Sequence, residues 1–256
     1  MNGANCLRFA THNSRLVTEG PLQQQLVCSK SVKDLVIALQ HAGENQWTPI
    51  SLATAWHRLA KHAQGSAMSD RSSCAAEVHR VATKLGDLHL QYEPYRFPPR
   101  ALANSLYAWG KLRVFHEKLV LAACGSLSGR VADCKAQELS NAAYGLALLR
   151  FRHEELLAAM SSIVPDRFHE FSNQNISNFV YSLGVIRYRN DLVLTAVCPR
   201  LSIRLSSFTT QGISNTIYSL SLLRIRDTAL LLMRALAYHG GCQISSLKRS
   251  RICCMH

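Results

Sequence analysis

A seven-residue block ending in Asn-x-x-Tyr occurs four times at a constant interval in this sequence. The copies cover residues 101–107, 138–144, 175–181 and 212–218. Their asparagines are Asn104, Asn141, Asn178 and Asn215. The interval is 37 residues each time (141 − 104, 178 − 141 and 215 − 178). A constant period of about 20–50 residues is typical of a stacked array, in which no single unit can bury its own apolar face.

The composition of one period predicts two helices joined by a turn. Leu139, Ala142, Ala143, Leu146 and Leu149 follow the i, i+3, i+4, i+7 spacing of one helix face. A turn containing arginine follows, and then Asn190-Asp191 or Asp227, which suit the first position of a second helix. The expected second helices cover residues 191–198 and 227–236. The unit is therefore helix, turn, helix, loop.

Weaker copies of the unit lie upstream. Residues 50–61 form a degenerate first helix with Thr54 in place of the asparagine, and residues 69–91 fit an insertion and its second helix. Residues 31–40 predict a further helix capped by Ser31. We therefore predict an all-α fold, an α-solenoid of about five helix-turn-helix repeats with a 37-residue period, over residues 31–237.

The two ends depart from the repeat. Residues 1–30 are expected to be a disordered start, and the arginines, serines and threonines of its first part fit an organelle-targeting presequence. Residues 238–256 are expected to form an irregular tail. Since the next first helix would centre near position 252 and nothing there resembles it, we expect a fragment or an altered end that lacks any C-terminal domain.

Small residues recur four and six positions after each repeat asparagine. The residues at these positions are Ala108, Gly145, Ser182 and Ser219, and Gly110, Ala147, Gly184 and Ser221. Glycine inside a helix costs about 1 kcal/mol relative to alanine, so a compensating interaction is expected. We predict that these positions allow neighbouring helices to approach closely.

The composition favours a polyanionic partner over catalysis. The formal net charge is +13, and arginine, which predominates in the repeats, donates two hydrogen bonds at once to phosphate. The sequence contains no Gly-rich phosphate loop, no zinc-protease or serine-hydrolase motif and no C-x-x-C pair. We therefore expect no catalytic residue, no cofactor, no metal site and no membrane partner.

Arginines in the turns are the candidate RNA-binding residues. They are Arg113, Arg150, Arg152, Arg187, Arg189, Arg224 and Arg226. Stacking of the units would align them along one edge, where they could follow a phosphate backbone. Alternatively, each could cap the negative end of the preceding helix, or one arginine of a turn could cap while the other is exposed. We expect the three pairs to contribute more than Arg113.

The repeated asparagines and tyrosines are interpreted as structural. The tyrosines are Tyr107, Tyr144, Tyr181 and Tyr218. An asparagine at one fixed position could bind base edges, but it more often satisfies buried backbone groups. The tyrosines could stack on bases, but we expect a role between repeats in the core. Positions that vary just after the asparagine, Ser105, Ala142, Phe179 and Thr216, are the better candidates for sequence selectivity, whereas Gln137, Gln174 and Gln211 recur before the helix.

The segments 174–183 and 211–220 resemble the first-helix signature of octotricopeptide and heptatricopeptide repeats, found in organellar RNA-binding proteins of algae, dinoflagellates and apicomplexans. They are also similar to helical repeats of the kinetoplastid RNA-editing substrate-binding complex. The resemblance covers residues 31–237 and implies a mitochondrial or plastid protein that binds single-stranded or ribosomal RNA in processing, stability, translation or ribosome assembly. The alternative is a protein-binding scaffold among other organellar ribonucleoprotein subunits.

Overall fold

The computed structural model describes residues 20–65, 71–204 and 207–225. All regular structure in these ranges is helical. The α-helices are α1 (Pro21–Cys28), α2 (Val32–His41), α3 (Pro49–Gly65), α4 (Arg71–Leu90), α5 (Pro99–Leu112), α6 (Glu117–Ser128), α7 (Ala136–Leu149), α8 (Glu154–Arg167), α9 (Asn173–Val185), α10 (Asp191–Arg204) and α11 (Thr210–Leu222). Short 3-10 turns precede several of them: η1 (Glu44–Gln46), η3 (Pro94–Arg96), η4 (Val131–Asp133) and η5 (Phe168–Glu170).

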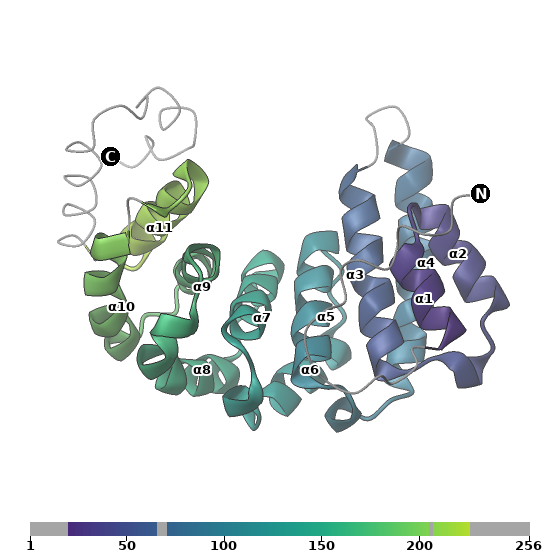
Figure 1. The fold of residues 1–256 in the computed structure, drawn as a ribbon, viewed down its shortest axis with the longest axis horizontal. Coiled ribbons are helices and arrows are strands. Elements are labelled where there is room, and N and C mark those ends of the chain that lie inside the picture. Colours follow the sequence, from purple (N-terminus) through teal and green to yellow (C-terminus); the bar gives the residue numbers. More distant parts are fainter. Residues whose placement is uncertain (1–19, 66–70, 205–206, 226–256) are drawn as a thin grey trace.

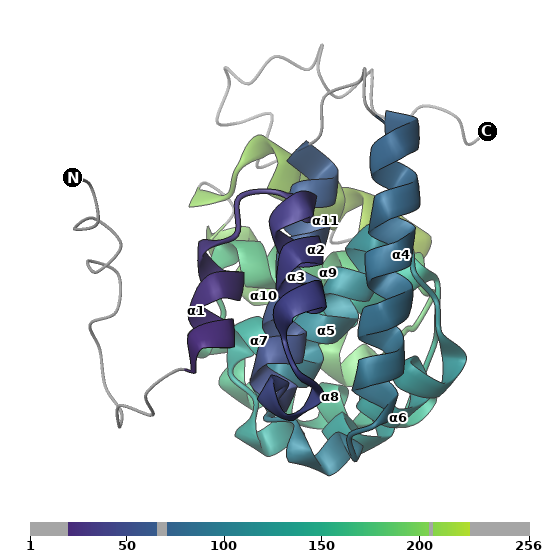
Figure 2. The same ribbon diagram turned by 90° about the vertical axis from the view of Figure 1, so that its right-hand side faces the viewer.

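The helices from α3 onward form two rows. In the inner row, α3, α5, α7, α9 and α11 each pack against the next. In the outer row, α4, α6, α8 and α10 do the same. Figure 1 shows a curved arrangement in which the inner row faces the hollow side and α6, α8 and α10 lie on the outside. Figure 2 shows α1 and α2 beside α3 and α4 at the N-terminal end.

Neighbouring inner-row helices approach closely at small residues, as the sequence predicts. A Cβ atom on Gly145 of α7 would lie 2.4 Å from the carbonyl oxygen of Leu106 in α5. One on Gly184 of α9 would lie 2.6 Å from the Cβ atom of Ser219 in α11. Contacts this short leave no room for a side chain, so the close packing depends on glycine at these two positions.

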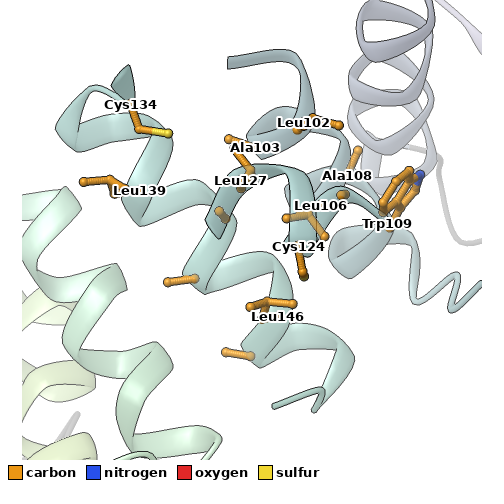
Figure 3. Close-up of a cluster of buried hydrophobic side chains, with 14 of the residues drawn as sticks. Leu102, Ala103, Leu106, Ala108, Trp109, Cys124, Leu127, Cys134, Leu139 and Leu146 are labelled. Atoms are coloured by element: carbon orange, nitrogen blue, oxygen red, sulfur yellow. The ribbon is translucent and has the colours of Figure 1, made fainter. Parts of the chain in front are cut away.

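The apolar core lies between the two rows. Figure 3 shows Leu102 and Leu106 of α5, Cys124 and Leu127 of α6, and Leu146 of α7 gathered between these helices. All five are at most 1% exposed. Burial raises the pKa of the Cys124 thiol to about 12, so this cysteine is a neutral, apolar packing group. Because the cluster draws on three helices, a single unit could not form it alone.

The predicted helices of the N-terminal part are present. α2 begins after Ser31, which forms a capping box with Asp34, and α3 covers the degenerate copy at residues 50–61. Within α4, Val81, Ala82 and Leu85 are buried. The expected second helix at residues 227–236 and the tail at 238–256 lie outside the described residues.

One helix was not predicted. Residues 21–28, assigned from sequence to a disordered start, form α1, which packs against α2 and α3. Leu22 and Leu26 supply its buried face, and Pro21 begins it. Two apolar residues one turn apart are too weak a periodic signal to be recognised in a sequence, and tertiary contacts stabilise so short a helix.

Within the described ranges, no helix is both long enough and apolar enough to cross a lipid bilayer.

Candidate RNA-binding face

The turns after α5, α7, α9 and α11 share one backbone conformation. Their first arginines, Arg113, Arg150, Arg187 and Arg224, have φ angles of 56°, 54°, 53° and 59°. In the turn after α7, the N–H of Arg150 donates to the carbonyl of Ala147 (3.1 Å), and the N–H of Phe151 donates to that of Leu146 (3.0 Å). This pair of bonds is the Schellman motif that closes a helix with one left-handed residue.

Arginine is an unfavourable choice at the left-handed position. Glycine usually occupies it, because a Cβ atom costs about 1–2 kcal/mol there. In the described part of the chain, these four arginines are the only residues other than glycine with positive φ. All four are exposed, and their guanidinium groups form no hydrogen bond or ion pair with described residues. Their backbones therefore close the helices, but their side chains serve no visible structural purpose.

Arg150 and Arg152 provide a test of this distinction. Replacing Arg150 by glycine is expected to raise the free energy of unfolding by about 1 kcal/mol, because the backbone strain is removed and no side-chain contact is lost. Replacing Arg152 by alanine is expected to lower it by about 1 kcal/mol through lost hydrogen bonds. Urea denaturation of both variants measures the difference, and a loss of stability in the glycine variant would contradict it.

In the two described turns that have a second arginine, after α7 and α9, that arginine is bound within the protein. Arg152 forms an ion pair with Glu154, donates to the carbonyl of Arg187 in the next turn (3.0 Å), and lies 5.3 Å from the ring centre of Tyr188. Arg189 likewise pairs with Asp191 (2.9 Å) and donates to the carbonyl of Leu223 (3.1 Å). These bonds show that successive turns lie side by side. Arg226 lies outside the described residues.

The relative contribution of these arginines to RNA binding stays a prediction, but the structure shows how their side chains are placed. The sequence pattern favoured the three pairs over Arg113 and allowed one arginine of each turn to cap while the other was exposed. In the structure, the first arginine closes the helix through its backbone while its side chain extends into solvent, and Arg152 and Arg189 are engaged with the next unit. Arg113 has the same geometry as Arg150, Arg187 and Arg224.

A third series of arginines was not predicted to have a role. Arg130, Arg167 and Arg204 follow the same period near the ends of outer-row helices. Each donates to a backbone carbonyl in the loop before the preceding inner-row helix. Arg130 donates to Phe97 (2.9 Å), Arg167 to Ala132 (3.2 Å) and Arg204 to Phe171 (2.9 Å). Their spacing was visible in the sequence. Because these side chains are used between units, part of the high positive charge is structural.

The repeat asparagines lie on the hollow side of the inner row. The residues four before and three after each asparagine share its helix face, as helical geometry requires. Four before are Arg100, Gln137, Gln174 and Gln211. The Nδ2 atom of Asn141 donates to the Oδ1 atom of Asn104 (3.3 Å), so this contact joins two repeats rather than an asparagine and a helix end.

The tyrosines form a continuous row of rings across this face. Their ring centres are 6.0 Å apart for Tyr107 and Tyr144, 5.8 Å for Tyr144 and Tyr181, and 6.5 Å for Tyr181 and Tyr218. His57 of α3 extends the row, 6.5 Å from Tyr107. These rings connect repeats, but at the surface rather than in the apolar core, and Tyr218 is 38% exposed. Partial burial raises the pKa of Tyr107, Tyr144 and Tyr181, so their phenols stay protonated and can donate hydrogen bonds.

The residues proposed for selectivity are buried. Ser105, Ala142, Phe179 and Thr216 are at most 2% exposed. They were chosen because they vary between repeats, but one residue along a helix turns the side chain by about 100°, away from the face that carries the asparagine. The glutamines Gln137, Gln174 and Gln211 are exposed and are the accessible polar residues of that face.

Two hollows open on the same face. The first, of about 680 Å³, is lined by residues of α1, α3, α5 and α7, including Asn104, Gln137 and Asn141. The second, of about 420 Å³, includes Tyr107, Tyr144, Asn178 and Asn215 in its lining. No group of three or more His, Cys, Asp or Glu residues among those described is arranged to hold a metal ion. The face offers amides, phenols and cations.

Comparison with models of known protein families found no match, and comparison with curated proteins found none either.

Proposed function

We propose that this chain is an α-solenoid of 37-residue helical-hairpin units that binds single-stranded RNA, including single-stranded parts of ribosomal RNA, in a mitochondrion or plastid. It acts without catalysis, by holding the strand along the inner row of helices. The observation that carries the proposal is the set of four exposed arginines at left-handed positions. A strained position filled repeatedly by a side chain without a structural partner indicates a function for its charge.

Arg150, one of the four arginines, lies near the tyrosine row. Partial burial raises the pKa of Tyr181, Tyr218 adds to this rise, and the charge of Arg150 opposes it. Arg150 of one unit is therefore near the tyrosine of the next. Guanidinium groups suit phosphates, rings stack on bases, and the amides of the half-buried asparagines and exposed glutamines can donate to and accept from base edges. Such a surface matches the chemistry of an unpaired strand.

The test is binding of the full chain to a labelled pool of random-sequence single-stranded RNA from about 50 to about 200 mM salt. In the test variant, the four left-handed arginines are all replaced by glycine. Each phosphate contact adds about 0.7 to the slope of log affinity against log salt, so the slope should fall by about 3. Thermal unfolding of the variant should occur at or above the wild-type temperature, because strain is relieved.

A second variant controls for net charge. Four exposed residues outside the inner row, Lys33, Lys84, Arg96 and Lys118, are replaced by glutamine. This removes as many positive charges as the arginine variant does. This variant is expected to keep most of the salt dependence. Equal losses of salt dependence in both variants would show that RNA binding depends on net charge and not on the positions of the four arginines. Absence of RNA binding by the wild-type chain would refute the proposal and favour a scaffold that holds a protein partner on the same face.

A further inference from the structure

Charge is distributed unevenly along the inner row. In α7, α9 and α11, the residues four before the repeat asparagine are exposed glutamines, and the residues three after it are tyrosines. In α3 and α5, the same face carries Lys61, Arg100 and Lys111. Lys61 and Arg100, with Arg58, line the larger hollow. The larger hollow therefore has three cations in its lining, whereas the second hollow has one, Lys111.

The acidic content of this hollow is low. Glu138 is the one carboxylate in its lining, and it is 8% exposed and accepts from the backbone N–H of Lys135 (2.9 Å) at the start of α7. Partial burial lowers the pKa of His57, and the charges of Arg58 and Lys61 lower it further. Lys61 and Arg100 are exposed and form no ion pair with any described residue. The positive charges that line the hollow are therefore available to bind an anionic ligand.

Helix α1 lies at the N-terminal end of the inner-row face. The Nε2 atom of Gln23 donates to Oγ1 of Thr54 (3.0 Å), and Arg58 donates to the carbonyl of Val27. Thr54 occupies the position that asparagine holds in the other units, so α1 covers the inner surface of α3. The Oε1 atom of Gln23 is buried without a hydrogen-bond partner, and Gln23 itself lines the hollow. A strand lying along the tyrosine row would meet α1 here and could go no further.

We infer that the hollow between α1, α3, α5 and α7 binds the terminal phosphate of the RNA strand. The inference rests on the proposed function. A terminal phosphomonoester carries about −1.5 to −2 charge at neutral pH and three acceptor oxygens, whereas an internal phosphodiester carries a single charge. Lys61 and Arg100 supply charge-assisted donors to those oxygens. The terminal nucleotide lies against His57 and Tyr107, and the strand continues over α7, α9 and α11.

The experiment compares three RNAs of one sequence: with a 5′-monophosphate, with a 3′-monophosphate, and with hydroxyl groups at both ends. Each is titrated against the full wild-type chain. One phosphorylated form is expected to bind at least about tenfold more tightly than the hydroxyl form. In a variant carrying Lys61→Gln and Arg100→Gln, this preference should disappear while the hydroxyl form binds within about threefold of wild type. A variant carrying Lys84→Gln and Lys118→Gln controls for the two lost charges.

The outcomes separate this inference from the proposed function. Equal binding of all three RNAs by wild type would overturn the terminal site and leave RNA binding intact. Retention of the preference in the Lys61→Gln, Arg100→Gln variant would place the terminal phosphate elsewhere and also overturn it. If no RNA binds but adenosine 5′-monophosphate binds in calorimetry, the hollow is a nucleotide site and both proposals fail. Loss of the end preference in the Lys61→Gln, Arg100→Gln variant, with the preference kept in the Lys84→Gln, Lys118→Gln variant, would support the assignment.

Discussion

Replacement of Gly145 by alanine is expected to lower the free energy of unfolding by about 2–3 kcal/mol, near the upper end of the usual cost of overpacking. The added Cβ atom would lie 2.4 Å from the carbonyl oxygen and 2.5 Å from the carbonyl carbon of Leu106, and 2.8 Å from the nitrogen of Tyr107. All three atoms belong to the backbone of α5, so no side-chain rotation can relieve the overlap. The two helices must move apart, which disturbs the packing of both neighbouring units.

Gly125 offers a matched comparison. It lies inside α6 and is exposed, and a Cβ atom added to it would meet no atom within 4 Å apart from the adjoining backbone of its own helix. Alanine there is expected to stabilise the protein by about 0.5–1 kcal/mol, since glycine is the poorer helix former. Urea denaturation of both variants separates the effect of helix propensity on the free energy of unfolding from the effect of steric overlap. Equal effects on the two free energies would show that α5 and α7 are not held as closely as described.

A large pH effect is expected from His89. This side chain is 5% exposed, stacks on Phe97 with ring centres 4.2 Å apart, and meets the edge of Trp109 at 5.3 Å. Burial lowers the pKa of His89 to about 4, from 6.5 for an unburied histidine. The unfolded chain therefore binds this proton more readily than the folded chain. The stability contributed by neutral His89 is complete above pH 6.5 and is lost as the pH falls towards about 4, a change on the order of 3 kcal/mol.

The measurement is the free energy of unfolding at several pH values for wild type and for His89→Leu. Other groups titrate in the same range, so the difference between the two curves is the informative quantity. Between pH 6.5 and about 4, the free energy of unfolding of wild type should fall by about 3 kcal/mol more than that of the variant. Parallel curves would show that His89 is protonated as readily in the folded protein as in the unfolded chain.

Much of the helical architecture could be predicted because its signals are periodic. The spacing of Leu139, Ala143 and Leu146 identifies a helix face, and the small residue at Gly145 predicts the close contact that the structure shows. Ser31 marks the start of α2 because its hydroxyl accepts from the N–H of Asp34. The helix α1 was missed because its stability depends on contacts with α2 and α3, which no local pattern records.

The candidate face was less predictable. Position in a repeat identified the right turns, but arginine gives no sign of a left-handed backbone, for which glycine is the usual marker. The partners of Arg152 and Arg167 are backbone carbonyls of neighbouring units, and these have no signature in side-chain sequence. Variation between repeats wrongly favoured Ser105 and Phe179, because orientation on the helix decides exposure and variability does not.

The arginine bonds between units end on main-chain carbonyls, and this has an evolutionary consequence. Arg152 reaches forward to the carbonyl of Arg187, and Arg167 reaches back to that of Ala132. Every residue type supplies a carbonyl, so these hydrogen bonds require no particular side chain at the accepting position. Duplication or loss of one 37-residue segment would leave these bonds able to form.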